Sequence, residues 1–368
     1  MVELSINSSL NDRISAFAKA GKTLAQYLDN KNGNYVENSW NHKIQAALQI
    51  AENKNAWFTQ ENLGYCLQQW SLALSQENLA AWLAPYHLSD IKPRAVAIIA
   101  AGNIPLVGFH DVLSVILSGH IAIIKVSGSD DVLLPLILQI ATSHFENLTD
   151  SYLFTEEKLE TYDAVIATGS DNTARYFEYY FRKVPNIIRK NRNSIAVLTG
   201  SETPEEMIAL SEDVFRYFGL GCRSVSHLKV PKDFNFDAFF QGMFTKRELI
   251  NNPKYLNNYD YNKAVFLMSE FKCLDNEFLI IKEEAESYTS PIASLGYSFY
   301  ENLDAVAEEV SSNADRLQCV VSSKSTRKQI SNSENATPQF VDFGMTQRPS
   351  LTDYADGVDT VDFLLKLS

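Results

Sequence analysis

The stretch RAVAIIAAGNIPLVGFHDVLSVILSGHIAIIKVS (residues 94–127) decides the fold of this chain. Residues 94–102 form an apolar run of the kind that makes a strand buried on both faces. Residues 105–119 form a predicted helix, with proline in its first turn and Gly119 at its end. Residues 120–127 form a second buried strand. Because strand, helix and strand follow one another, the stretch predicts a βαβ unit with parallel strands.

The same alternation continues along the rest of the chain. A predicted helix (132–145) precedes a third strand (163–169), which leads into a helix from Asp171, and a fourth strand covers 194–200. Five more strand candidates follow: VSHLKVP (225–231), AVFLMS (264–269), EFLIIKE (277–283), SLGYSF (294–299) and LQCVVSS (317–323). This pattern predicts an α/β fold with a parallel sheet. The polar stretch 324–339 is expected to be a surface helix and loop.

The first part of the chain has a different pattern. Residues 8–83 repeat apolar side chains at helical spacing, most clearly in 10–28, 41–58 and 61–74. We expect amphipathic helices there, whose Trp and Leu stripes belong to the core. The predicted helical segment therefore precedes the alternating part.

Composition argues against nucleic-acid binding and membrane insertion. The 368 residues carry a net charge of −13, whereas a phosphate footprint needs clustered Lys and Arg. No run of about 18 apolar residues occurs, and the first residues lack the pattern of a signal peptide. Four cysteines show neither disulfide-framework nor zinc-site spacing. We expect a cytoplasmic protein of two or three domains without a metal.

Cys222 is the first candidate catalytic residue. It lies in YFGLGCRSVSHLKVP (217–231), between a predicted helix and a strand, and Gly219 and Gly221 flank it. Glycines let a ligand approach the backbone closely, so such a turn presents a nucleophile well. A lone cysteine is nevertheless more often a small buried residue. The other three, Cys66, Cys273 and Cys319, lie in apolar runs that indicate core positions.

Neither the GxGxxG nor the P-loop pattern occurs in the α/β part. Several segments instead resemble the aldehyde dehydrogenase superfamily in order: 100–136, ATGSDNTARYF (167–177), NRNSIAVLTG (191–200) and the segment around Cys222. GCRSVSHLKVP, GNIP and the tail TQRPSLTDYADGVDTVDFLLKL (346–367) resemble the LuxC-like acyl-CoA reductase family more closely. The resemblance covers about residues 90–368.

The resemblance implies a Rossmann-type parallel-sheet cofactor domain joined to an α/β catalytic domain, with NADPH, or else NADH, as cofactor. The expected divisions are 1–198 for the helical segment and cofactor domain, 199–345 for the catalytic domain and 346–368 for a tail. We expect this tail to pack on a neighbouring subunit of a homo-oligomer, where its alternating pattern adds a strand.

By the same resemblance, Cys222 attacks an acyl thioester, and the Asn103 side-chain amide and the Cys222 backbone N–H stabilise the carbonyl oxygen. Taken alone, Asn103 is better explained as a turn residue before Pro105, and its place ahead of this helix and strand favours the oxyanion role instead. His227, five residues after the cysteine, is expected to be structural, because odd spacing on a strand places the two side chains on opposite faces.

Cofactor contacts also follow from the resemblance. Lys125 and Ser127 would meet the adenosine ribose or a 2′-phosphate, and Gly169 and Ser170 would meet the diphosphate or approach the nicotinamide. Glu286 would hold the nicotinamide ribose. The alternatives are a lysine that extends to solvent, a plain tight turn, and an acidic helix end. The family's last small position of the 167–177 motif is alanine here, Ala174, rather than glycine.

One departure from the superfamily bears on the reaction. Hydrolytic aldehyde dehydrogenases carry a glutamate about 30 residues before the nucleophile, whereas residues 187–197 contain no acid, and an ungapped count places Arg189 or Lys190 there. Without that base, hydrolysis of the acyl-enzyme is slowed. This favours reduction of an acyl donor to an aldehyde.

The expected substrate is an acyl-CoA or another acyl thioester, with a separate acyl-donor protein as a further expected partner. Two alternatives stay open from the sequence. One is a cysteine acyltransferase or thioesterase without a cofactor, and the other is a non-catalytic binder of acyl-CoA or nucleotide.

Overall fold

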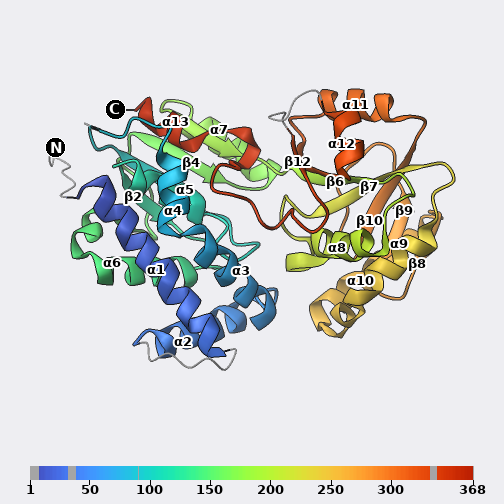
Figure 1. The fold of residues 1–368 in the computed structure, drawn as a ribbon, viewed down its shortest axis with the longest axis horizontal. Helices are drawn as coiled ribbons and strands as arrows, with labels where there is room; N and C mark the ends of the chain where they lie inside the picture. The colour runs from blue at the N-terminus through green and yellow to red at the C-terminus, as the bar shows by residue number, and fades with distance from the viewer. Residues whose placement is uncertain (1–7, 32–38, 90, 332–337, 368) are drawn as a thin grey trace. The chain divides into compact units, whose positions relative to one another are not determined.

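The computed structural model describes residues 8–31, 39–89, 91–331 and 338–367, which divide into two compact units (Figure 1). Unit 1 contains the residues up to Lys190 together with Ser350–Tyr354 and the residues from Val358. Unit 2 contains Asn191–Pro349 and Ala355–Gly357. The division after Lys190 precedes the expected boundary after residue 198, because the strand that lies between them pairs with the sheet of unit 2.

Unit 1 is built around a five-stranded parallel sheet with the order β3-β2-β1-β4-β5. Its strands are β1 (Ala95–Ile99), β2 (Ile121–Lys125), β3 (Tyr152–Phe154), β4 (Ala164–Thr168) and β5 (Asn186–Arg189). The chain runs outward from β1 through β2 to β3, then returns to the other side of β1 for β4 and β5. This order confirms the predicted parallel α/β sheet, and the crevice beside β1 is where such sheets bind ligands.

Helices cover both faces of this sheet. The first four, which confirm the predicted helical segment, are α1 (Leu10–Lys31), α2 (Asn41–Lys54), α3 (Gln60–Ala73) and α4 (Gln76–Leu83). Helix α1 packs against α3, α4, α5 (Phe109–Leu117) and α6 (Leu133–His144). On the opposite face, Phe177 and Phe181 of α7 (Asp171–Phe181) pack on Ala97, Val165 and Ala167.

Helix α5 begins later than predicted. It starts at Phe109, so Pro105 precedes the helix and does not occupy its first turn. Leu106 adopts a left-handed φ of 58°, and its backbone N–H donates to Oδ2 of the buried Asp130 at 2.7 Å. This bond stabilises a turn where apolar spacing alone had predicted helix.

Unit 2 contains a seven-stranded sheet with the order β12-β11-β6-β7-β10-β9-β8, in which only β8 is antiparallel to its neighbour. Its strands are β6 (Asn193–Val197), β7 (Val225–Pro231), β8 (Cys273–Asp275), β9 (Ile280–Glu283), β10 (Ser294–Tyr300), β11 (Leu317–Val321) and β12 (Gln339–Val341). Helices α8 (Pro204–Phe215), α9 (Phe236–Met243) and α10 (Pro253–Met268) lie on one side, with α11 (Leu303–Ser312) and α12 (Lys324–Ile330) on the other (Figure 1).

The prediction of a strand at 264–269 is wrong, because this run ends helix α10. The helix begins at Pro253 after Asn252, whose side chain accepts the backbone N–H groups of Lys254 and Tyr255. Its buried face consists of Tyr255, Tyr259, Asn262 and Phe266, which recur at helical spacing. The helical spacing of this buried face extends along the whole of α10, and it outweighs the short apolar run 264–269 that favoured a strand.

The tail also differs from its prediction. The expected strand within 346–368 is instead helix α13 (Thr360–Leu365), which Asp359 caps and which packs on α5 of the same unit. Val361 and Leu364 are fully buried one helical turn apart. This segment therefore completes the core of its own unit, whereas packing on a neighbouring subunit stays a prediction. Among the described residues, no helix is both long and apolar enough to cross a membrane.

One buried ion pair joins three elements of unit 1. Arg189, at the end of β5, contacts the Asp111 carboxylate of α5 at 2.6 Å, and both side chains are more than 90% buried. The same guanidinium donates to Thr360 Oγ1 of α13 at 3.0 Å. Removal of one partner would leave an uncompensated charge in the core.

We therefore predict that Asp111→Ala lowers the free energy of unfolding by about 3–5 kcal/mol. The matched control is Lys190→Met, which breaks the exposed pair between Lys190 and Glu178 and is expected to cost less than about 1 kcal/mol. Urea unfolding followed by circular dichroism measures both. Equal effects of the two substitutions would contradict the anchoring role of Asp111.

Candidate active site

The candidate cofactor-binding residues of unit 1 meet at one edge of its sheet. Asn103 follows β1, Lys125 ends β2, and Gly169 and Ser170 follow β4. Because β2, β1 and β4 are adjacent and parallel, their carboxyl ends share that edge. The loops also touch: the Gly102 carbonyl accepts a hydrogen bond from Ser129 Oγ at 3.1 Å. A Cβ at Gly102 would lie only 2.7 Å from Ser127.

Lys125 places its ammonium group against the loop that follows β3. Its Nζ donates to the backbone carbonyls of Glu156 and Glu157 at 3.2 and 3.1 Å. Ser127 forms a hydroxyl pair with Ser129 at 2.9 Å. The ammonium group is thus held at the edge of the sheet by two backbone carbonyls.

In the turn between β4 and α7, the backbone at Gly169 lies close to the first turn of the helix. Ser170 is the N-cap of α7, and its Oγ accepts the Thr173 N–H at 3.3 Å. A Cβ at Gly169 would lie 3.0 Å from the Thr173 side chain and 3.1 Å from Phe177. Ala174 is fully buried, so the position that differs from the family still holds a small side chain against the sheet.

These residues fit a nicotinamide dinucleotide in their chemistry. The free N–H groups of a helix start attract a diphosphate, and the exposed Ser170 marks the start of α7. The Lys125 ammonium and the Ser127 hydroxyl suit a ribose or a 2′-phosphate. Neither Gly102 nor Gly169 has room for a larger side chain, because a Cβ at these positions would lie 2.7 Å from Ser127 and 3.0 Å from Thr173.

Cys222 lies in a turn of unit 2 that follows a strained segment. The turn joins the short 3₁₀ segment Arg216–Gly219 to β7, and Tyr217, Phe218 and Gly219 all adopt left-handed φ values of 55–75°. Such conformations cost free energy in non-glycine residues and concentrate at functional sites. These left-handed residues lie only a few positions before the candidate nucleophile.

Exposure distinguishes Cys222 from the other cysteines. Cys222 is exposed, whereas Cys66 and Cys319 are buried. The expectation that Cys273 is a core residue is wrong, because it lies half-buried on the edge strand β8. Burial raises the pKa of the Cys273 thiol, which lowers its thiolate fraction and hence its nucleophilicity.

Hydrogen bonds from β6 and from within the turn fix the backbone around Cys222. Its carbonyl accepts a hydrogen bond from Ser194 Oγ of β6 at 2.9 Å, and the Gly221 carbonyl accepts the Ser224 N–H at 2.9 Å. A cavity of about 30 Å³ beneath the turn is lined by residues that include Gly219, Ser226 and Ser290. That space is about enough for one water molecule and not for an acyl chain.

His227 is buried on β7, with Nε2 2.9 Å from Ser298 Oγ. Burial lowers its pKa to about 4, so the ring is neutral at physiological pH. This environment supports the structural interpretation of His227 over a partnership with the exposed Cys222.

Glu286 belongs to unit 2, whereas the other cofactor candidates belong to unit 1. It is exposed in the loop after β9 of unit 2, and its N–H donates to Glu284 Oε1 at 3.1 Å. Its role toward a ribose stays a prediction.

An ungapped count places Arg189 or Lys190 where hydrolytic aldehyde dehydrogenases carry a glutamate, and both side chains form ion pairs. Arg189 is enclosed with Asp111, so Arg189→Glu would place a second carboxylate against Asp111 rather than beside a water molecule. Lys190 is paired with Glu178 at the surface. Neither side chain is a base that activates water in these pairings.

Two buried acids were missed in the sequence. Asp130 binds the Leu106 N–H in the loop that carries Asn103, and burial raises its pKa to about 7. Asp213 of α8 accepts the Gly344 N–H at 2.6 Å and the Thr346 N–H at 2.9 Å. A single aspartate in a sequence carries no sign of a distant backbone partner, so only the structure identifies these two.

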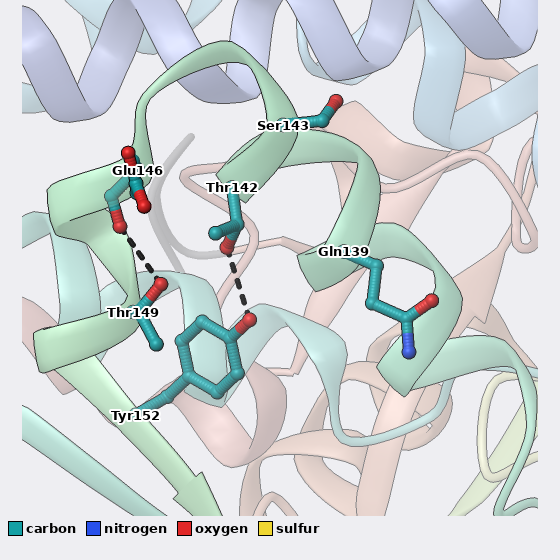
Figure 2. A pocket seen from close by; sticks show the side chains of 6 residues that line it. All are labelled: Gln139, Thr142, Ser143, Glu146, Thr149 and Tyr152. Carbon is teal, nitrogen blue, oxygen red and sulfur yellow. Dashed lines mark hydrogen bonds between the residues drawn. The ribbon is translucent and has the colours of Figure 1, made fainter.

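A surface hollow of unit 1 lies at the opposite edge of its sheet, where β3 begins (Figure 2). The hydroxyl groups of Thr142 and Tyr152 are hydrogen-bonded at 2.9 Å, and Thr149 Oγ1 donates to the Glu146 carbonyl. The candidate residues lie at the carboxyl ends of the strands, so this hollow is separate from the candidate cofactor site.

Comparison with known proteins supports one family. The model of the family described as acyl-CoA reductase (LuxC) matches residues 6–233, more than half of the chain. Long-chain acyl-protein thioester reductase 2 from Photobacterium leiognathi is 24% identical over 218 residues. That match covers 53% of this chain and 45% of the relative, so it spans less than half of the relative's length.

Solved structures with a similar fold include aldehyde dehydrogenases. Aldehyde dehydrogenase 21 from Physcomitrella patens has a TM-score of 0.65 at 12% identity, covering 98% of this chain and 85% of that one. A NAD-dependent benzaldehyde dehydrogenase from Corynebacterium glutamicum has a TM-score of 0.65 at 11% identity, covering 98% and 84%. At such identities the similarity concerns the fold. The chain therefore has an aldehyde dehydrogenase-like fold and belongs to the LuxC family of acyl-CoA reductases.

Proposed function

We propose that this protein reduces an acyl thioester to an aldehyde with NADPH, through an acyl-enzyme on Cys222. The observation that carries the proposal is the exposed Cys222 in a glycine-flanked turn that directly follows the strained residues Tyr217 and Phe218, in a chain of the acyl-CoA reductase family. Unit 1 supports the cofactor half of the proposal, because its sheet edge gathers Lys125, Ser127, Gly169 and Ser170.

The Cys222 thiolate attacks the thioester carbonyl carbon, and the donor's thiolate leaves and takes up a proton. The negative charge on the carbonyl oxygen is stabilised by the Cys222 backbone N–H and the Asn103 side-chain amide. A reduced nicotinamide, when bound, supplies a hydride to the acyl carbon. The resulting hemithioacetal on Cys222 then collapses, which releases the aldehyde and restores the cysteine.

Protection from water favours this direction. Residues 187–197 contain no acid, and Arg189 is enclosed with Asp111. An acyl-enzyme without a nearby general base hydrolyses slowly and survives until hydride arrives.

The acyl donor is the finer part of the proposal. CoA is the donor that the family description names, whereas the relative from Photobacterium leiognathi is named for acyl-protein thioesters. We propose acyl-CoA as the substrate and a partner protein's acyl thioester as the second candidate. A thioesterase or acyltransferase without a cofactor is disfavoured, because it gives no role to the cofactor-type sheet edge of unit 1.

We predict that Cys222→Ala abolishes aldehyde formation and leaves NADPH binding nearly intact, because the thiol carries the acyl group. Incubation with NADPH and a series of acyl-CoA esters, followed by absorbance loss and aldehyde analysis, measures this. Cys273→Ser is the matched control, since Cys273 is half-buried and has a raised pKa. Iodoacetamide should modify Cys222 fastest. Activity that survives in Cys222→Ala would rule out the mechanism.

Lys125→Ala is predicted to weaken NADPH binding more than NADH binding, because a 2′-phosphate forms a charge-assisted contact with an ammonium group. Titration of each cofactor by fluorescence measures the two dissociation constants. Lys158→Ala removes an exposed lysine from the loop whose carbonyls Lys125 binds, and should change neither constant. Equal losses for both cofactors in Lys125→Ala would reassign Lys125 to the ribose hydroxyls and favour NAD.

A further inference from the structure

The two residues after Cys222 are bound to a segment far along the chain. Arg223 donates from Nε to the Thr346 carbonyl, and from Nη2 to Gln339 Oε1 at 2.9 Å. Ser224 Oγ accepts a hydrogen bond from Gln347 Nε2 at 3.1 Å. All of these residues belong to unit 2. The segment Gly344–Gln347 therefore lies directly against the turn that presents the candidate nucleophile.

This segment is itself fixed to helix α8. The fully buried Asp213 accepts the Gly344 N–H at 2.6 Å with one carboxylate oxygen and the Thr346 N–H at 2.9 Å with the other. Gly344 has a φ of +79°, and a Cβ there would lie 3.2 Å from the Ala209 side chain. Charge-assisted bonds to both oxygens leave this stretch of backbone little freedom.

The other side of the turn is held by β6. Ser194 Oγ donates to the Cys222 carbonyl and accepts the Cys319 N–H at 3.1 Å. Cys222 is thus fixed through its carbonyl from one side and through Arg223 and Ser224 from the other, while its own side chain is exposed. Such an arrangement constrains the direction of the thiol and of the Cys222 N–H without contacting a substrate.

We propose that Gly344–Gln347, anchored by Asp213, is a positioning segment that holds Cys222 in the orientation for attack on the thioester. The proposal rests on the proposed function, in which Cys222 is the nucleophile. Arg223, Ser224 and Gln347 are positioning residues that act through the backbone of the turn. A displacement of about 1 Å at a reacting group costs on the order of 10²-fold in rate.

Gln347→Leu and Ser224→Ala, singly and together in the full chain, test this role. We expect each to slow acylation of Cys222 by roughly 10- to 100-fold in single-turnover mixing with an acyl-CoA. The KM for acyl-CoA and the NADPH dissociation constant should be unchanged. The double variant should be no slower than the slower single variant, because both remove the same contact. Arg223→Met, at a half-buried side chain, should slow acylation as well.

The control is Tyr300→Phe, which removes a 2.9 Å hydrogen bond to the Leu198 carbonyl elsewhere in unit 2. It should lower Tm to a similar extent without slowing acylation. Wild-type acylation rates in Gln347→Leu and Arg223→Met, with only Tm reduced, would overturn the positioning role. Absence of acylation in the unmodified protein would contradict the proposed function, and the positioning role with it.

Discussion

Parallel pairing of β1 with both β2 and β4 is the constraint on which the cofactor half of this protein depends. It places the carboxyl ends of three neighbouring strands at one edge, so the loop with Asn103, the end of β2 at Lys125 and the start of α7 at Ser170 lie at that edge. Helices α5 and α7 cover the faces of the sheet. The loops at the carboxyl ends of the strands therefore carry the candidate functional residues. The dinucleotide site that we propose at this edge does not require the GxGxxG pattern, because the strand order itself brings these loops together.

Buried aspartates stabilise the loops and the tail. Asp111 pairs with Arg189, Asp130 binds the Leu106 N–H, and Asp213 binds Gly344 and Thr346. Burial raises the pKa of Asp130 to about 7 and that of Asp213 to about 6. Burial disfavours the charged form of both carboxyl groups. The hydrogen bonds that they accept from backbone N–H groups offset this cost. Asp130 binds the loop that carries Asn103, and Asp213 binds the segment that contacts Arg223 and Ser224 beside Cys222.

The sequence predicted the elements whose signal is long and local. The apolar runs of β1, β2, β4, β6 and β7 were recognisable, and so was the turn with Cys222. Short strands such as β3 and β8 were missed, because three residues carry no periodicity. The late start of α5 and the helical form of 264–269 follow from contacts outside each segment, at Asp130 and along the buried face of α10. Bonds from Asp213 and Arg223 to Thr346 join distant parts of the chain, and no local pattern records them.

The most direct test of the account is single-turnover mixing with a radiolabelled acyl-CoA in the absence of NADPH. We predict that label accumulates on Cys222 and persists, because residues 187–197 contain no acid that could activate water. Addition of NADPH should then release the label as aldehyde, and addition of free CoA should return acyl-CoA. Rapid release of free fatty acid without any cofactor would contradict the reductase account and support a thioesterase.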